Sequence, residues 1–354
     1  MAEIPVDTTA PVLVTGATGY VAGWLVRDLL EAGVTVHAAI RNPDDPTKTA
    51  PLQAMADAAP GTIRFFRADL LQDGAYAEAM KGCRIVFHTA SPFSTSVKDP
   101  QRELVDPAVK GTRNVLEEAS RTPSVERVVL TSSCAAIYAD ATDCARASGG
   151  KLSEEDWNTT ASLDYQPYSY SKTEAERTAW DIADAQSQWR LVTVNPSLVL
   201  GPASHGTPTS ESFSIIKRMG DGSFRSGVPR LGIGVVDARD VAQAHIAAGF
   251  LSDVQGRYIV SAHDTDLLTV AQALHATYGD RYPIPSKPLP KWLVWLVGPF
   301  RGLSRRFVAN NVDVPWHIDN SKGKRELGLT YRPLDVTVRD MFAQMIEAGT
   351  FPET

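Results

Sequence analysis

Cysteine is scarce in this chain of 354 residues, which has only three, at positions 83, 134 and 144. Their number is odd and none forms a CxxC pair, so the sequence offers neither a disulfide framework nor a zinc site. The seven histidines also lack metal-binding spacing. We therefore expect reduced thiols in a cytoplasmic protein that holds no metal.

Long apolar runs and an excess of basic residues are lacking too. The first ten residues, MAEIPVDTTA, do not have the basic region and apolar core of a signal peptide. The densest apolar run, residues 292–297, is far shorter than the ~20 residues that span a bilayer, so we expect no stable membrane insertion. Arginines at 301, 305 and 306 leave room for a helix on a membrane surface, although a helix that caps a substrate-binding lobe is favoured. The formal net charge of -6 argues against nucleic acid as the main partner.

Through the first two thirds of the chain, short β-branched runs alternate with longer amphipathic segments. Several of these runs are almost continuously apolar, as expected for parallel strands that helices cover on both faces. The alternation predicts an α/β fold with a doubly wound, Rossmann-type parallel sheet. The predicted strands are residues 11–15, 34–40, 62–67, 84–89, 127–131, 190–195 and 256–260, and the first predicted helix is residues 20–32.

A glycine-rich turn joins the first strand to this helix. Residues 15–23 read TGATGYVAG. Gly16 and Gly19 permit a tight turn and a close approach of the backbone to a pyrophosphate, and a small residue at position 22 lets the helix pack on the strand. The free N–H groups of the helix N-terminus then receive the phosphates. We predict a dinucleotide site that includes Gly16, Thr18, Gly19, Tyr20 and Val21.

The end of the second strand favours NADP over NAD. An NAD site usually has a carboxylate there, but this strand ends in AIRN. Arg41 can pair with a 2′-phosphate, and Lys48 can add a second positive charge, although Asp44 and Asp45 between them weaken the local field. After the third strand, Asp69 and Leu70 are placed to reach the adenine end, and Asp69 could equally cap the segment that follows.

The composition changes after about residue 200. Residues 201–234 are rich in Gly, Ser and Pro, and residues 279–300 hold five prolines, which predicts loops and small elements. Because residues 256–260 read as one more strand, the two lobes are expected to interleave. We predict an NADP-binding Rossmann domain at residues 10–202 plus about 232–262, and a smaller C-terminal substrate-binding lobe at 203–231 and 263–354.

A tyrosine and a lysine begin a later helical pattern, in which residues 167–172 read PYSYSK. Tyr168 and Lys172 are one turn apart and lie on one helix face. A phenol with its ordinary pKa near ~10 is a poor acid at neutral pH, but a neighbouring ammonium favours the phenolate. The spacing alone is common on solvated helices, so it gains meaning only from the nucleotide turn upstream.

With both features, the chain resembles the extended short-chain dehydrogenase/reductases, in the subgroup of dihydroflavonol reductases, cinnamoyl-CoA reductases and yeast-type aldehyde/ketone reductases. The matching segments include TGATGYVAGWLV at 15–26, AIRNPDDPTK at 39–48, VFHTASPF at 86–93, PAVKGTRNVLEEA at 107–119, VVLTSS at 128–133, YSYSK at 168–172 and NPSLVLGP at 195–202. The match is looser after about residue 264.

The resemblance implies a serine–tyrosine–lysine catalytic set. Tyr168 would be the general acid, and Lys172 would assist it and hold the nicotinamide ribose. Ser132 and Ser133 both end the fifth strand, where neighbours face opposite sides, so only one can reach the substrate. The related reductases use the second serine of this run, which is Ser133. Many relatives also have an asparagine in a proton relay where this chain has Ala108, so a relay here must use water or the lysine alone.

Other contacts implied by the resemblance flank this set. Glycine is usual in relatives where this chain has Ala22, although Gly23 follows it. His88 is expected to be a hydrogen-bonded structural histidine. The further predicted cofactor contacts are Thr89, Ala90, Ser91, Pro196, Ser197 and Val199, and the predicted substrate contacts are Ser91, Phe93, Ser133, Tyr165 and Phe213.

The expected function is that of an NADPH-dependent carbonyl reductase acting on an aldehyde or ketone with an apolar or aromatic body, as a monomer or homodimer. Alternatives on the same fold are a hydroxysteroid dehydrogenase/isomerase and a sugar-nucleotide epimerase. A non-catalytic NADP-binding protein is disfavoured, because such proteins tend to lose the tyrosine or the lysine.

Overall fold

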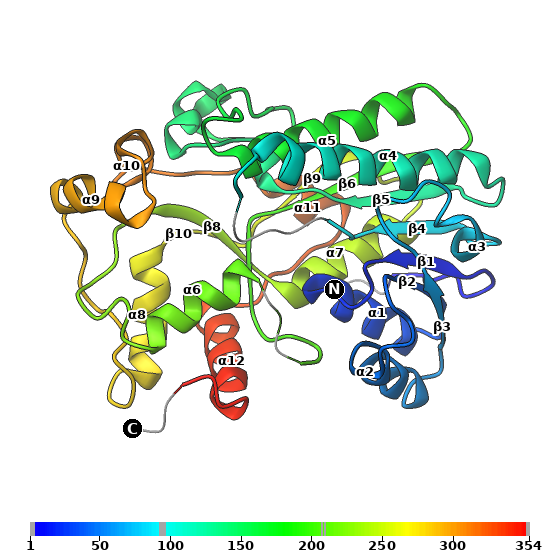
Figure 1. Ribbon diagram of the computed structural model, residues 1–354, viewed down its shortest axis with the longest axis horizontal. Coiled ribbons are helices and arrows are strands. Elements are labelled where there is room, and N and C mark those ends of the chain that lie inside the picture. Colours follow the sequence, from blue (N-terminus) through cyan, green and yellow to red (C-terminus); the bar gives the residue numbers. More distant parts are fainter. Residues whose placement is uncertain (1–3, 92–96, 207, 209, 352–354) are drawn as a thin grey trace.

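A seven-stranded parallel sheet forms the centre of the computed structural model, which describes residues 4–91, 97–206, 208 and 210–351 (Figure 1). The strand order is β3-β2-β1-β4-β5-β6-β9. The strands are β1 (Val12–Thr15), β2 (Thr35–Ile40), β3 (Thr62–Arg67), β4 (Ile85–His88), β5 (Arg127–Thr131), β6 (Arg190–Pro196) and β9 (Gly256–Val260). The predicted doubly wound α/β fold is confirmed, and each predicted strand lies within about two residues of its observed place.

Helices cover both faces of this sheet because its strands are apolar on both sides. In β1, Val12 and Val14 pack into one core and Leu13 into the other, as the alternation of a strand requires. The first core holds α1 (Tyr20–Glu31), α2 (Pro46–Asp57) and α7 (Ala238–Phe250). The second holds α3 (Ala77–Met80), α4 (Asp106–Arg121) and α5 (Pro167–Asp184).

The strand order reverses between β1 and β4, where ligands of such sheets bind. From β1 the chain proceeds outward through β2 and β3, then returns to place β4 on the other side of β1. Loops that leave the carboxyl ends of β1 and β4 therefore diverge and open a crevice. This crevice lies beside the glycine-rich turn.

A smaller lobe packs beside the carboxyl ends of the strands. Its sheet has the order β10-β8-β7, with β8 parallel to β7 and antiparallel to β10. Its elements are β7 (Leu198–Leu200), α6 (Glu211–Gly220), β8 (Gly232–Asp237), β10 (His263–Asp266), α8 (Leu267–Tyr278), α9 (Lys291–Val297), α10 (Arg305–Asn311) and α12 (Leu334–Glu347). Helix α11 (Ser321–Glu326) instead packs on β9 of the large sheet. Residues 232–262, which were predicted to belong to the Rossmann domain, are divided between the two sheets. Strand β9 joins the large sheet, whereas β8 belongs to the small one.

Short helical turns connect these elements. They are η1 (Gln101–Val105), η2 (Cys134–Ala136), η3 (Ala141–Arg146), η4 (Ser148–Gly150) and η5 (Gly298–Arg301). Within the described ranges, the helices are too short or too polar to cross a bilayer. Cys83, Cys134 and Cys144 are all buried free thiols.

Candidate functional site

A cleft of about 660 Å³ opens at the carboxyl ends of the large sheet. Its walls come from the start of α1, the segments after β4, β5 and β6, the first turns of α5 and the start of α6. The predicted site residues that border it are Gly19, Tyr20, Val21, Thr89, Ser91, Ser133, Tyr168, Lys172, Pro196, Ser197 and Val199. Residues from distant parts of the sequence are therefore brought to one cleft.

The glycine-rich turn has the geometry that a pyrophosphate site requires. Gly16 has a φ of +62°, and a Cβ atom there would lie 2.9 Å from Cα of Ala90. Gly19 begins α1 without any side-chain cap, so the first N–H groups of the helix stay available for an anion. Half-buried Thr18 lies between the two glycines. The turn fits a dinucleotide.

The departure from the usual third glycine has a local explanation. Ala22 is buried against the sheet, where its methyl group fits. The adjacent Gly23 faces the loop after β7, and a Cβ atom there would lie only 2.4 Å from Oγ of Ser204 and 2.7 Å from Cε1 of His205. Glycine is needed one position later because this loop packs directly on α1.

The surroundings of the predicted 2′-phosphate site are more positive than the sequence alone suggests. Arg41 and Lys48 are both exposed at the end of β2 and in the first turn of α2. Asp44 forms an ion pair with Arg67, and Asp45 caps α2, so both carboxylates between the two cations are already engaged. Arg67 was not among the predicted residues. It reaches this site because the parallel pairing sets it beside the end of β2.

The Asp69–Leu70 segment is fixed by local bonds. The Asp69 carboxylate accepts a hydrogen bond of 2.8 Å from the backbone N–H of Leu71, which is the alternative capping role. The Leu70 carbonyl accepts from Nδ2 of Asn114 at 2.9 Å, and its side chain packs on Gly111 of α4. Both residues are therefore held at the edge of the sheet.

Hydrogen bonds to Thr15 hold the segment after β4. Its hydroxyl oxygen lies 2.9 Å from Nδ1 of His88 and accepts from the N–H groups of Thr89 at 3.2 Å and Ala90 at 3.1 Å. Burial, and then the positive charge of Lys172, lower the pKa of His88 to about 3. His88 is thus neutral at physiological pH.

Phe93, one of the predicted substrate contacts, lies outside the described residues.

Tyr168 and Lys172 occupy the first two turns of α5 and face the cleft. The Tyr168 ring is 48% exposed, and Nζ of Lys172 lies 5.8 Å from its centroid. The same ammonium donates to Oγ of Ser91 at 3.0 Å. Gln166, in a left-handed conformation with φ 54°, precedes the helix and donates to Ala139 O at 2.6 Å. The start of α5 is therefore fixed against the loop after β5.

The two serines that directly follow β5 differ in burial and in hydrogen-bond partner. Ser132 is buried, and its hydroxyl donates to the carboxylate of Glu176. Ser133 is half-buried at the cleft, and its Oγ accepts a bond of 3.1 Å from the N–H of Ala135. Its hydroxyl proton remains free to donate. Both serines border the cleft, and Ser133 is the one whose hydroxyl is not bonded to Glu176.

Two predicted substrate contacts do not border this cleft. The Tyr165 hydroxyl donates to Asp140 at 2.7 Å, and the guanidinium of Arg306 stacks 3.8 Å from its ring. Phe213 is buried in the smaller lobe, edge-on to Tyr20 at 5.3 Å. Their rings pack inside the protein, whereas residues 210–212 of the same segment line the cleft.

A buried carboxylate behind the cleft was missed in the sequence. Glu176 is 1% exposed and lies one turn after Lys172. Its Oε1 accepts from Nε of Arg257 at 2.6 Å, and its Oε2 accepts from Nδ2 of Asn195 at 2.7 Å. The sequence could have indicated this residue, because its position four residues after Lys172 places both side chains on one face of the helix. This group ties α5 to β5, β6 and β9.

A small cavity of about 20 Å³ lies beside Lys172. Ala108 forms part of its wall together with Thr112 and Glu176. This volume is sufficient for one water molecule, and the wall offers polar partners. A water held there would lie next to Lys172.

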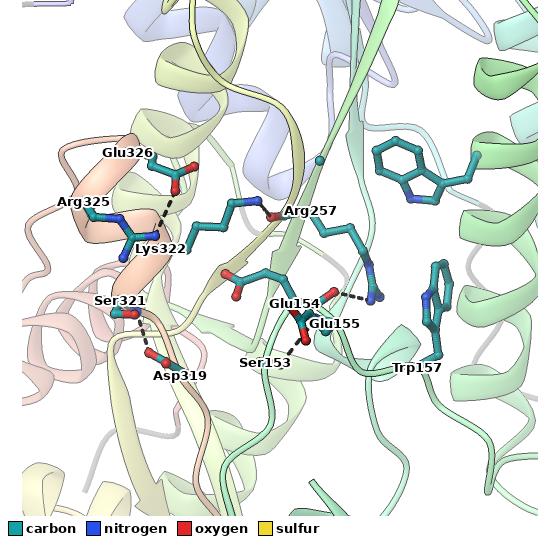
Figure 2. Close-up of a pocket in the computed structure, with 12 residues that line it drawn as sticks. Ser153, Glu154, Glu155, Trp157, Arg257, Asp319, Ser321, Lys322, Arg325 and Glu326 are labelled. Carbon is teal, nitrogen blue, oxygen red and sulfur yellow. Dashed lines mark hydrogen bonds and ion pairs between the residues drawn. The ribbon is translucent and has the colours of Figure 1, made fainter. Parts of the chain in front are cut away.

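A second hollow, of about 600 Å³, lies between the start of edge strand β9, α11 and residues 153–157 (Figure 2). Figure 2 shows Arg257 beside Trp157, whose ring centroid is 4.0 Å from the guanidinium carbon. Arg257 donates to Glu154 O at 2.9 Å, and Lys322 donates to Arg257 O at the same distance. These bonds link the hollow to the network around Glu176, although Nη2 of Arg257 is buried without a hydrogen-bond partner among the described residues. Among the described residues, no cluster of His, Cys, Asp and Glu could hold a metal ion.

Comparisons with known proteins agree with this geometry. Residues 12–257 match the NAD dependent epimerase/dehydratase family. A cinnamoyl-CoA reductase of Medicago truncatula is 36% identical over 346 residues, which are 95% of either chain. The structure of Gre2 from Candida albicans in complex with NADPH is similar with a TM-score of 0.76 and 28% identity, over 96% of this chain and 99% of that one. Yeast methylglyoxal/isovaleraldehyde reductase Gre2, also complexed with NADPH, has the same TM-score and coverage at 27% identity.

These relatives confirm the predicted oxidoreductase class and the predicted NADP cofactor. The family match covers most of the chain and includes both the glycine-rich turn and the Tyr168–Lys172 pair. The chain belongs to the NAD dependent epimerase/dehydratase family, among the extended short-chain dehydrogenase/reductases.

Proposed function

We propose that this protein is an NADPH-dependent carbonyl reductase that converts an aldehyde or ketone to an alcohol. The observation that carries this proposal is the meeting of Ser133, Tyr168 and Lys172 in one cleft beside the glycine-rich turn. In the division of labour we propose, the large sheet with its helices binds the dinucleotide and the smaller lobe closes over the substrate.

The residues present would hold NADPH along the carboxyl edge of the sheet. The N-terminus of α1 would receive the pyrophosphate, and Arg41 with Lys48 the 2′-phosphate. Thr89, Ala90 and Ser91 would border the nicotinamide half on one side, and Pro196, Ser197 and Val199 on the other. When bound, NADPH supplies the hydride.

The side chains of the cleft would supply the proton and the charge stabilisation. The Ser133 hydroxyl would donate a hydrogen bond to the carbonyl oxygen, whose negative charge grows during the reaction. Tyr168 would transfer its phenolic proton to that oxygen, which completes the alcohol. Lys172 would stabilise the phenolate left behind, and a proton from solvent, passed through a water in the small cavity and Lys172, would restore the phenol. The apolar wall, which includes Tyr138, favours a substrate with an apolar body.

The test compares two tyrosines of one helix. Tyr168→Phe should lower kcat by about 100-fold or more, the usual contribution of a general acid, with NADPH affinity unchanged. Tyr170→Phe is the matched control, because Tyr170 lies on the same helix but borders a different depression. NADPH oxidation would be followed by absorbance with a panel of benzaldehyde-like and β-ketoester substrates. An undiminished rate in Tyr168→Phe would refute the assignment.

The two serines provide a second matched pair. Ser133→Ala should lower kcat by about 100-fold, as expected when one hydrogen bond to the developing oxyanion is removed. Ser132→Ala should lower the melting temperature instead, because it removes a donor to a buried carboxylate. If the two variants exchange these effects, Ser132 is the catalytic serine.

A further inference from the structure

The segment α9–η5 (residues 291–301) exposes large apolar side chains that the rest of the fold does not cover. Trp292 is 67% exposed, Leu296 53% and Phe300 86%. Trp295 and Val297 are also exposed. Five of the eight large hydrophobic side chains that are exposed among the described residues thus fall within nine consecutive positions. Such clustering marks an interaction surface, whereas isolated exposed hydrophobics are ordinary.

This segment is firmly held, so its exposed face is a stable feature of the fold. Only Val294 of α9 is buried, in a small cluster with Val308 of α10 and Val312, which directly follows that helix. Nζ of Lys291 donates to Ala309 O at 3.0 Å and to Val312 O at 2.6 Å. The two short helices form one corner of the molecule (Figure 1). The expected helix exists, but it turns most of its apolar side chains to solvent.

The same region is strongly basic in an acidic protein. Residues 281–312 contain six lysines and arginines and no aspartate or glutamate, whereas the whole chain has a net charge of -6. The six cations are Arg281, Lys287, Lys291, Arg301, Arg305 and Arg306. Within the described parts of the chain, the ion pairs with carboxylates do not include any of them. The guanidinium of Arg305 lies 4.3 Å from the Trp295 ring, so charge and apolar surface are adjacent.

We propose that α9–η5 binds the surface of a membrane that contains anionic lipids. Tryptophan and phenylalanine side chains favour the boundary between headgroups and acyl chains, and the flanking arginines would contact the anionic headgroups. Each cation near such a surface adds about 1 kcal/mol, or roughly fivefold in affinity. The segment would lie in the plane of the interface without crossing the bilayer.

A second copy of this chain fits the surface less well. A two-fold dimer through this face would bring the same patch onto itself, so Arg301 and Arg305 of one copy would meet those of the other. Like charges brought together in this way oppose association. An anionic surface covers the apolar side chains and neutralises the arginines together.

Vesicle flotation with the full-length protein tests the proposal. The protein should float with phosphatidylcholine vesicles that contain about 30% phosphatidylserine at low salt, and much less with phosphatidylcholine alone. Trp292→Ser with Phe300→Ser should lower the partition coefficient by about 100-fold, since each burial is worth about tenfold. Arg301→Gln with Arg305→Gln should lower it by about 25-fold, at fivefold for each charge.

The matched control is Leu163→Ser with Arg64→Gln, which removes one exposed apolar and one exposed basic side chain elsewhere. It should float like the parent. Thermal unfolding would establish that each variant is folded. The proposal is overturned if the parent does not float, or if the Trp292/Phe300 variant floats equally well. A parent that sediments as a dimer and does not float, with a monomeric Trp292/Phe300 variant, would assign the face to a second copy.

Discussion

Replacing Glu176 with glutamine should weaken both the fold and the reaction. The carboxylate faces only donors, which include Nε of Arg257, Nδ2 of Asn195 and the hydroxyl of Ser132. A carboxylate accepts from all of them, whereas an amide presents one acceptor and one donor. At least one donor must therefore lose its partner in Glu176→Gln.

The cost to stability follows from the burial of the Glu176–Arg257 ion pair. Removing one member of a buried pair costs about 3–5 kcal/mol, because the other charge is left uncompensated. Arg257 keeps its bonds to Glu154 O at 2.9 Å and Asp156 O at 2.6 Å, so we expect the lower end, about 3 kcal/mol. At about 2 °C or more per kcal/mol, the melting temperature should fall by roughly 6 °C.

The cost to activity follows from the position of Ser133. Nδ2 of Asn195 bonds Glu176 and also donates to Ser133 O at 3.2 Å, so the network holds the backbone of the proposed catalytic serine. A displacement of about 1 Å at a reacting centre can cost 100-fold in rate, and we expect kcat to fall at least tenfold. NADPH affinity should change little, because the hydrogen-bond partners of this carboxylate in the described parts of the chain do not include the glycine-rich turn or Arg41, which would hold the phosphates.

The assay combines thermal unfolding, NADPH titration and steady-state reduction of a preferred aldehyde. Glu118→Gln is the control, because Glu118 is also buried but pairs on α4 with the exposed Arg121. It should have little effect on either property. If Glu176→Gln loses stability but keeps its kcat, the network supports the fold without positioning the serine.

Two further predictions concern the cofactor and the pH dependence of stability. Arg41→Ala should weaken NADPH binding at least tenfold in a fluorescence titration and leave NADH binding nearly unchanged. The reason is that a charged hydrogen bond to the 2′-phosphate is worth about 1.5–3 kcal/mol. Equal losses of affinity for both cofactors would show that Arg41 does not bind the 2′-phosphate. Burial raises the pKa of Asp28 from 3.8 to about 6, so the stability linked to its protonated form is complete below pH 3.8 and lost as the pH rises through about 6. Asp28→Asn keeps an oxygen that accepts the hydrogen bond from Gln243. It should therefore stabilise the protein by up to about 3 kcal/mol at pH 8 and hardly at all near pH 4. Urea unfolding that shows the same gain in stability at both pH values would contradict this.

The sequence predicted the large sheet well because its strands are compact apolar runs bounded by glycine or polar residues. It predicted the smaller lobe poorly, since α8 and α12 lie next to segments whose prolines and glycines dominate the local pattern. Many of the predicted site residues that lie on motifs border the cleft, but Tyr165 and Phe213, which no motif singles out, do not. Nothing in a linear sequence tells which way such a ring points.

Long-range partners were the other gap. The sequence shows Asp44 and Asp45 as charges that oppose NADP, yet Arg67 neutralises Asp44 because parallel pairing places Ile40 opposite Arg67. That register joins residues more than twenty positions apart. The position of Glu176 could have been predicted, because its spacing from Lys172 places it on the same face of α5. Its partner Arg257 could not, because it comes from β9, at the edge of the sheet.

Helix α5 explains how this site can combine an accessible acid with a fixed geometry. Successive turns of one face present Tyr168 at 48% exposure, Lys172 half-buried and Glu176 at 1%. The helix thus runs from the cleft into the core, and its reactive end is held by its buried end. Because Ser132, Asn195 and Arg257 all converge on Glu176, the helix, the serine strand and two further strands share one anchor. A substitution at Tyr168 should therefore lower kcat alone, whereas a substitution at Glu176, on the same face, should lower both kcat and the stability of the fold.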